Sequence, residues 1–235
     1  MARKFTIMKR AFSFLLIVAL FTNCANNTQP TDAAHSGKKN IPTVSIVGEM
    51  RNVMHKGELA GTINLDTISN KSHLYGLGPV EFLNGEILIV DGKCYVSKVV
   101  NDSAMTVQET FQVKAPFFVY SNVEHWFEVA VPDSVQNIHQ LELYLDQVTK
   151  KCVRPFAFRI VGNIDSAKIH IVNLPAGSIV HSPEEAHQGQ KTYSVINKEV
   201  EITGFFSTEH AGVFIHHDSF VHMHLLTNDK KQMGH

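Results

Sequence analysis

Histidines near the end of the sequence have the types and the spacing of metal ligands. If residues 220–227 form a β-strand, side chains alternate between its two faces, so His222 and His224 project from the same face. The polar run 228–234 favours a turn that reverses the chain and returns His235 to this pair. Three imidazole ligands leave one position of a tetrahedral zinc ion open, as catalytic zinc sites do.

The same residues also fit interpretations without a catalytic zinc ion. The sequence contains 14 histidines, and a buried imidazole is satisfied by a hydrogen bond as well as by a metal. A cupin-type metal oxygenase also carries an H-x-H pair on a strand, but it normally has a glutamate a few residues later, where this sequence has Asn228 and Asp229. His210, His216 and His217 lie near the pair in sequence; extra metal ligands are one alternative for them, but they are more typical of loop or strand-end residues.

The composition favours a medium-sized globular protein and argues against nucleic-acid binding. The chain has 235 residues, enough for one medium domain or two small ones with a substantial core. Its formal net charge is -1, and no stripe of lysine and arginine alternates with aromatic residues. A nucleic-acid partner is therefore not expected.

The N-terminus has the pattern of an export signal. Basic residues precede an apolar run at 11–21 that is too short to span a bilayer. Cys24 follows this run, as the lipid-carrying cysteine does in bacterial lipoproteins, so residues 1–23 are predicted to be a lipoprotein-type signal peptide and 24–40 a flexible tether. A plain secreted protein is the alternative. Either way we expect an exported protein, in the cell envelope or secreted, with membrane contact only through a lipid on Cys24.

Two further cysteines, Cys94 and Cys152, lie in the body of the protein. They lack the CxxC spacing of thiol-redox or zinc-thiolate sites. A disulfide between them and two free buried thiols both remain open.

The pattern along the chain predicts an α+β fold of mixed, mainly antiparallel β-sheets with a few helices. Apolar residues at helical spacing predict a helix over 42–55, and a second helix is predicted over 132–149. Asn84-Gly85 and Asp91-Gly92 predict the two turns of a three-stranded meander over 79–100. Strands are also predicted at 156–161 and 167–172. A polar loop from residue 174 then separates an N-terminal α+β half, 41–173, from a C-terminal β half, 174–235, that carries the metal histidines.

From about Thr43 onward the chain resembles the alpha-acetolactate decarboxylase family. The motifs that carry the resemblance are HLYGLGPVEFLNGEILIVDGKCY at 73–95, APFF at 115–118, EITGFFS at 201–207 and HMHLLTNDKKQMGH at 222–235. The last motif is the most specific, because the family's zinc ligands are two histidines at i and i+2 and a third eleven residues on. The resemblance therefore implies Zn²⁺ bound by His222, His224 and His235.

The resemblance also implies the residues that work beside the metal. Glu86 matches a family glutamate that lies by the zinc ion, whereas a solvated or turn-bonding glutamate is the alternative. His170 stands where the family has an active-site arginine, and in its cationic form it is expected to orient the substrate's carboxylate. Pro79 replaces a family threonine. A further family glutamate follows the third histidine, and the sequence given ends at His235.

The activity that the resemblance implies is carboxy-lyase chemistry: zinc-dependent decarboxylation of 2-acetolactate, a small 2-hydroxy-3-oxo acid, to acetoin and CO2. Because of Pro79, His170 and the short C-terminus, we expect this activity to be weak. The alternative is a non-catalytic envelope lipoprotein that keeps the fold and the metal and binds a small keto acid or a partner. Members of the family are usually dimeric, so a homodimer is an expectation.

Overall fold

The structure, a computed structural model, describes residues 17–20 and 43–235. Two six-stranded antiparallel sheets make up most of it, with a few helices at their edges. The predicted α+β fold of mainly antiparallel sheets is therefore confirmed. The lipid attachment at Cys24, the tether 24–40 and most of the predicted signal 1–23 lie outside the described residues and stay predictions. In the described part of the chain, no helix has the length and apolar character needed to cross a membrane.

The first sheet comes from the earlier part of the chain, and its strands lie in the order β2-β9-β4-β5-β6-β7. Their bounds are β2 Ser45–Val47, β4 Leu74–Pro79, β5 Glu86–Val90, β6 Lys93–Asn101, β7 Ala104–Glu109 and β9 Phe118–Asn122. Strand β5 is buried along its whole length, at the middle of the molecule. A two-stranded sheet of β3 Ile63–Asn64 and β8 Lys114–Ala115 lies beside it.

The meander was predicted partly correctly. Asp91 and Gly92 have φ angles of 44° and 76° and join β5 to β6 as a tight hairpin turn, as predicted. The turn predicted at Asn84-Gly85 is wrong, because Asn84 has a φ of -110°. Residues 80–85, which include the 3-10 helix η2 Glu81–Leu83, form a longer connection, and the preceding strand lies at Leu74–Pro79 rather than 79–83.

The second sheet carries the histidine pair, and its strands lie in the order β10-β1-β11-β12-β13-β14. Their bounds are β1 Ile17–Leu20, β10 Phe127–Ala130, β11 Phe156–Ile171, β12 Lys191–Phe206, β13 Val221–Thr227 and β14 Met233–Gly234. The strands predicted at 156–161 and 167–172 are one continuous strand, because β12 pairs with β11 along its length. The predicted boundary at residue 173 stays a prediction; β11 shares its sheet with the C-terminal strands.

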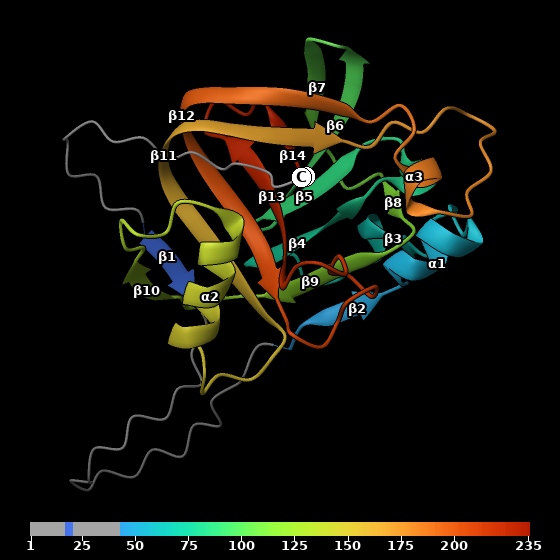
Figure 1. The fold of residues 1–235 in the computed structure, drawn as a ribbon. Helices are drawn as coiled ribbons and strands as arrows, with labels where there is room; N and C mark the ends of the chain where they lie inside the picture. The colour runs from blue at the N-terminus through green and yellow to red at the C-terminus, as the bar shows by residue number, and fades with distance from the viewer. Residues whose placement is uncertain (1–16, 21–42) are drawn as a thin grey trace, which may run out of the picture.

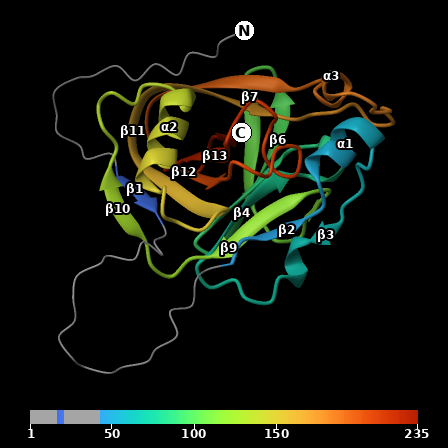
Figure 2. The same cartoon turned by 60° about the horizontal axis from the view of Figure 1, so that its bottom comes forward.

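Three α-helices flank the sheets: α1 Met50–Lys56, α2 Ile138–Val148 and α3 Pro183–Ala186. The helix predicted over 42–55 is wrong in its first half, where β2 pairs with β9 and Gly48, with a φ of 68°, turns the chain into α1. Helix α2 begins later than predicted, capped by the Asn137 side chain, which accepts from the Gln140 amide at 2.9 Å. Figures 1 and 2 show α2 outside the second sheet and α1 beside α3.

The two sheets face each other across a shared apolar core. Side chains from the first sheet, such as Leu77 and Leu88, pack with Phe205 and Leu226 from the second. Burial of these side chains is the main force that holds the sheets together. In Figure 1 the C-terminus lies in the middle of the molecule, among β5, β13 and β14. The end of the chain is therefore built into the interior between the sheets.

Candidate active site

Strand β13 places two histidines between the sheets. His222 and His224 lie opposite Phe205 and Thr203 on β12, and they are 3% and 0% exposed. Alternation along the strand puts both rings on one face, with their centroids 5.2 Å apart. Imidazoles seldom lie this deep without a specific partner.

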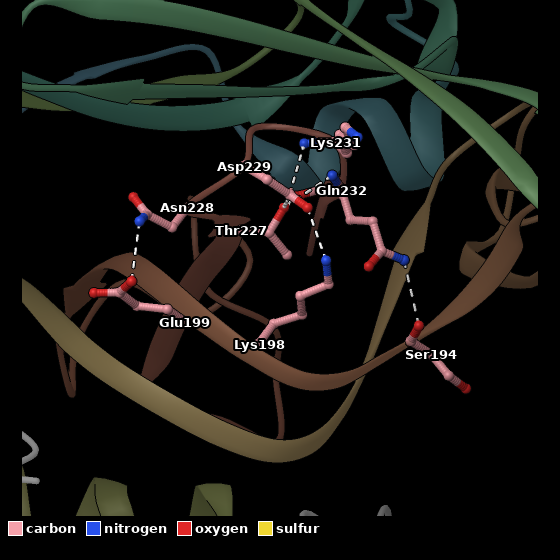
Figure 3. Close-up of polar contacts among 8 residues, drawn as sticks. All are labelled: Ser194, Lys198, Glu199, Thr227, Asn228, Asp229, Lys231 and Gln232. Atoms are coloured by element: carbon pink, nitrogen blue, oxygen red, sulfur yellow. Dashed lines mark hydrogen bonds and ion pairs between the residues drawn. The ribbon is translucent and has the colours of Figure 1, made fainter.

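The turn after β13 is held by its own polar side chains (Figure 3). The Asp229 carboxylate accepts from the Thr227 hydroxyl at 2.7 Å and from the Lys231 amide at 3.2 Å, and it pairs with Lys198 at 2.7 Å. The Lys198 and Thr227 contacts keep the pKa of Asp229 well below its usual range. Asn228 donates to Glu199 on β12 at 3.0 Å. These contacts fix the direction in which the chain returns through β14.

The returning chain brings His235 to the histidine pair. The His235 ring centroid lies 4.8 Å from that of His222 and 5.5 Å from that of His224. The backbone of His235 is tied to β11 by two hydrogen bonds with His170, at 2.8 and 3.0 Å. The backbone of His235 therefore pairs with β11 as a strand residue would.

The spacing of the three rings is that of a zinc site. Zinc bound at about 2.0 Å to three imidazole nitrogens in tetrahedral geometry would place the ring centroids about 5 Å apart, and the observed separations are 4.8, 5.2 and 5.5 Å. The nitrogen atoms themselves do not converge: over residues 17–20 and 43–235, no group of three or more His, Cys, Asp or Glu meets the geometry needed to hold a metal ion. Backbone position sets the ring spacing, while the terminal ring torsion, which is broad in histidine, sets the nitrogen direction.

Three of the ring nitrogens of His222 and His224 also lack a hydrogen-bond partner. The Nδ1 atom of His222 and both ring nitrogens of His224 are buried without a hydrogen bond. Burial lowers the pKa of His224 to about 3, offset only in part by the nearby Ile87 carbonyl, with which no well-formed hydrogen bond exists. Burial, and then the neighbouring histidines, hold the pKa values of His222 and His235 well below their usual range. Neutral imidazoles with open lone pairs are what a zinc ion binds, so the donor set fits zinc.

Glu86 lies at the start of β5, beside the histidines. Its Oε2 is 3.7 Å from Nε2 of His224, and its Oε1 accepts from the Val172 amide at 3.1 Å. The residue is 3% exposed. Burial raises the pKa of Glu86 to about 8, and the hydrogen bond from Val172 lowers it only in part. The carboxyl group can therefore hold a proton at neutral pH, as a general acid must.

The raised pKa makes the stability of the metal-free protein depend on pH. The pKa of Glu86 is about 8 in the folded protein, above its ordinary value of 4.5. The stabilisation that the protonated carboxyl group gives the folded state is therefore complete below pH 4.5 and is lost as the pH rises through about 8. The full effect is on the order of 5 kcal/mol. We expect the free energy of unfolding of metal-free wild type, measured in urea, to fall relative to that of Glu86→Gln between about pH 5 and pH 8. A difference that is constant over this range would contradict the raised pKa.

Sequence reasoning missed two hydroxyl residues of the site. Ser97 lies opposite Glu86 across the β5–β6 pair, and Thr203 lies opposite His224; both side-chain oxygens are buried without a partner. The hydroxyls gave no signal in the sequence, because serine and threonine on a strand acquire a role only from the strand opposite. His216, expected as a loop residue, lies in a loop, and its ring stacks on that of His235 with the centroids 5.4 Å apart and the planes at 8°.

Other parts of the fold support or border the site. Pro79 pairs with Glu86 across β4 and β5, so the missing threonine hydroxyl would have stood next to the carboxyl group. Glu142 of α2 accepts from the Ser219 hydroxyl at 2.5 Å and the Phe220 amide at 2.8 Å, which anchors the entry to β13. Cys94 is buried and Cys152 half-buried, and the two form no disulfide with each other.

A large hollow on the described part of the protein does not contain these residues. It is an open groove of about 1290 Å³, lined mainly by residues 57–62 and 173–178. Its lining includes Asn84 and Asn173, which form a backbone bridge next to Glu86, but none of the site histidines. We expect the chemistry at the histidines, because buried nitrogen atoms without hydrogen-bond partners lie there and not in the groove.

Comparison with known proteins bears directly on this site. The model of the alpha-acetolactate decarboxylase family matches residues 47–235. The chain belongs to the alpha-acetolactate decarboxylase family. This family consists of carboxy-lyases that act on a small molecule, acetolactate, and membership therefore supports decarboxylation as the family-level activity. The comparison with curated proteins returned no match.

Solved structures share the decarboxylase fold at low sequence identity. Alpha-acetolactate decarboxylase from Bacillus subtilis strain 168 aligns with a TM-score of 0.60 at 22% identity, over 82% of this chain and 78% of that one. Acetolactate decarboxylase from Bacillus subtilis subspecies spizizenii gives 0.60 and 22%, over 82% and 79%. A Staphylococcus aureus protein of unknown function, described as similar to alpha-acetolactate decarboxylase, gives 0.59 and 18%, over 82% and 78%. These likenesses establish the fold.

Proposed function

We propose that this protein is a zinc-dependent decarboxylase that converts 2-acetolactate to acetoin and CO2. The observation that carries the proposal is the group of three buried histidine rings at zinc-like spacing beside a buried carboxyl group, in a chain of this family. His222, His224 and His235 would hold the ion. When bound, zinc supplies a Lewis acid that polarises the substrate's oxygens and stabilises negative charge as CO2 leaves.

Glu86 would manage the proton. Burial raises the pKa of Glu86 to about 8 in the metal-free protein, so the carboxyl group can take up a proton near neutral pH and deliver it to the carbon from which CO2 has left. The hydrogen bond from the Val172 amide to Oε1 fixes one oxygen, so the other oxygen, Oε2, faces His224. This arrangement delivers the proton to one face of that carbon, as the formation of a single enantiomer requires.

The surroundings would keep water from the reacting carbon. Phe117 lies with its ring centroid 6.2 Å from that of His222, and Phe205 and Phe214 pack edge to face next to the same strand. All three are at most 3% exposed. In such an apolar enclosure, charges interact more strongly than in water.

A second candidate is a protein that binds the metal and a small keto acid without turnover. Pro79 favours it, because a proline beside Glu86 offers no hydroxyl to substrate or proton. The role predicted for His170 from the resemblance, orienting the substrate carboxylate as a cation, stays a prediction.

One experiment separates the two candidates. Metal-depleted full-length protein is titrated with zinc while bound zinc and acetoin formation from 2-acetolactate are measured on the same sample. The proposal predicts acetoin formation that rises until about one zinc is bound per chain, and that a chelator abolishes it. Zinc bound without acetoin above the rate in protein-free buffer would instead favour the binding protein.

A further inference from the structure

His170 contacts the last histidine through both its backbone and its side chain. Its amide donates to the His235 carbonyl at 2.8 Å, and the His235 amide donates back at 3.0 Å. Nδ1 of His235 lies 3.0 Å from Nε2 of His170, and the two rings meet edge to face at 4.6 Å. His170 is 8% exposed, so little water competes for this bond.

Glycine lets the two strands approach closely enough for this contact. A Cβ atom on Gly234 would lie 2.6 Å from the His170 carbonyl oxygen and 3.3 Å from Cβ of Ile169. Any other residue at this position would therefore push β14 away from β11. The close approach of β14 to β11 at Gly234 allows the rings of His170 and His235 to be in contact.

The ring-to-ring hydrogen bond has a consequence for metal binding. When both imidazoles are neutral, one proton lies between them, so one nitrogen donates and the other accepts. If Nδ1 of His235 donates, its Nε2 keeps a free lone pair. Metal-binding histidines usually have this arrangement, with the second nitrogen donating to a fixed acceptor that orients the ring.

We infer that His170 is a positioning residue for His235: Nε2 of His170 accepts the proton on Nδ1 of His235, so that Nε2 of His235 keeps a free lone pair for a metal ion shared with His222 and His224. The inference rests on the proposed function in that a metal ion is taken to occupy the three-histidine site. It gives His170 a role different from that of the family's arginine, since a guanidinium has no acceptor atom.

The two roles predict opposite results for His170→Arg. If His170 accepts from His235, arginine removes the acceptor, and we expect the zinc affinity of the full-length protein to fall about 10- to 100-fold. If His170 orients the substrate, arginine restores the family's cation: zinc affinity stays at the wild-type value and KM for 2-acetolactate falls. Zinc affinity is measured by competition with a chromophoric chelator, without substrate.

Two further variants keep the test informative if a buried arginine disturbs folding. His170→Leu has no acceptor and no charge, and it should lose zinc affinity like His170→Arg. His170→Gln offers an amide oxygen as acceptor, and it should stay within a few-fold of wild type. His125→Arg, at an exposed position, is the control for an added charge and should not change the affinity.

The outcomes distinguish this inference from the proposed function. Wild-type zinc affinity in a folded His170→Leu protein, or an equal loss in His170→Gln and His170→Leu, would overturn the positioning role whether or not acetoin forms. A protein that binds zinc and shows the predicted order of variants, yet forms no acetoin, would support the positioning role and refute the decarboxylase.

Discussion

A His224→Ala variant is expected to lose zinc binding and acetoin formation together. His224 is fully buried, and neither of its ring nitrogens has a hydrogen-bond partner, so its lone pair is available to a metal ion. Removal of one of three ligands should weaken zinc binding at least about a thousandfold, or about 4 kcal/mol. Calorimetric titration with zinc and the acetoin assay on the same preparation measure the two effects.

Zinc should raise the melting temperature of wild type but not that of this variant. A ligand that binds the folded state stabilises it in proportion to the logarithm of its concentration over Kd, so wild type should melt higher with zinc and His224→Ala should not. His125→Ala, at an exposed position, is the matched control and should behave as wild type. If His224→Ala bound zinc as tightly as the control, the three histidines would not be the metal site.

A Glu86→Gln variant should bind zinc but turn over substrate poorly. Glutamine keeps the neutral shape of a protonated glutamate and can still accept from the Val172 amide, but it has no acidic proton to transfer. Loss of a positioned general acid lowers kcat about 100- to 10,000-fold. Steady-state kinetics with zinc-loaded protein measure this effect, and zinc affinity should stay within a few-fold of wild type.

Glu81→Gln is the matched control for Glu86→Gln. Glu81 lies just before β5, but its carboxylate accepts from the Gly61 amide at 3.2 Å, away from the histidines. This variant should keep wild-type kcat. Equal activity in the two variants would show that another group supplies the proton.

The short-range features of the protein could be predicted from its sequence. Alternation along residues 220–227 placed His222 and His224 on one face, because side chains on any strand alternate. Asp91-Gly92 specified a hairpin turn, since both positions need positive φ, and the apolar spacing of 132–149 specified α2. The motifs of the chain also identified its family, which the family model matches over residues 47–235.

The three-dimensional site depended on contacts that no local pattern contains. His170 and His235 lie 65 positions apart, and their rings meet only because Gly234 lets β14 approach β11. Likewise the raised pKa of Glu86 comes from burial between two sheets, and Ser97 joins the site only through strand pairing. The sequence by itself determined which residue types were present and how they alternate, because these depend on neighbours along the chain. The tertiary structure decided which residues are in contact, which are buried away from water and which can hold a proton, because burial and strand pairing depend on segments far apart in sequence.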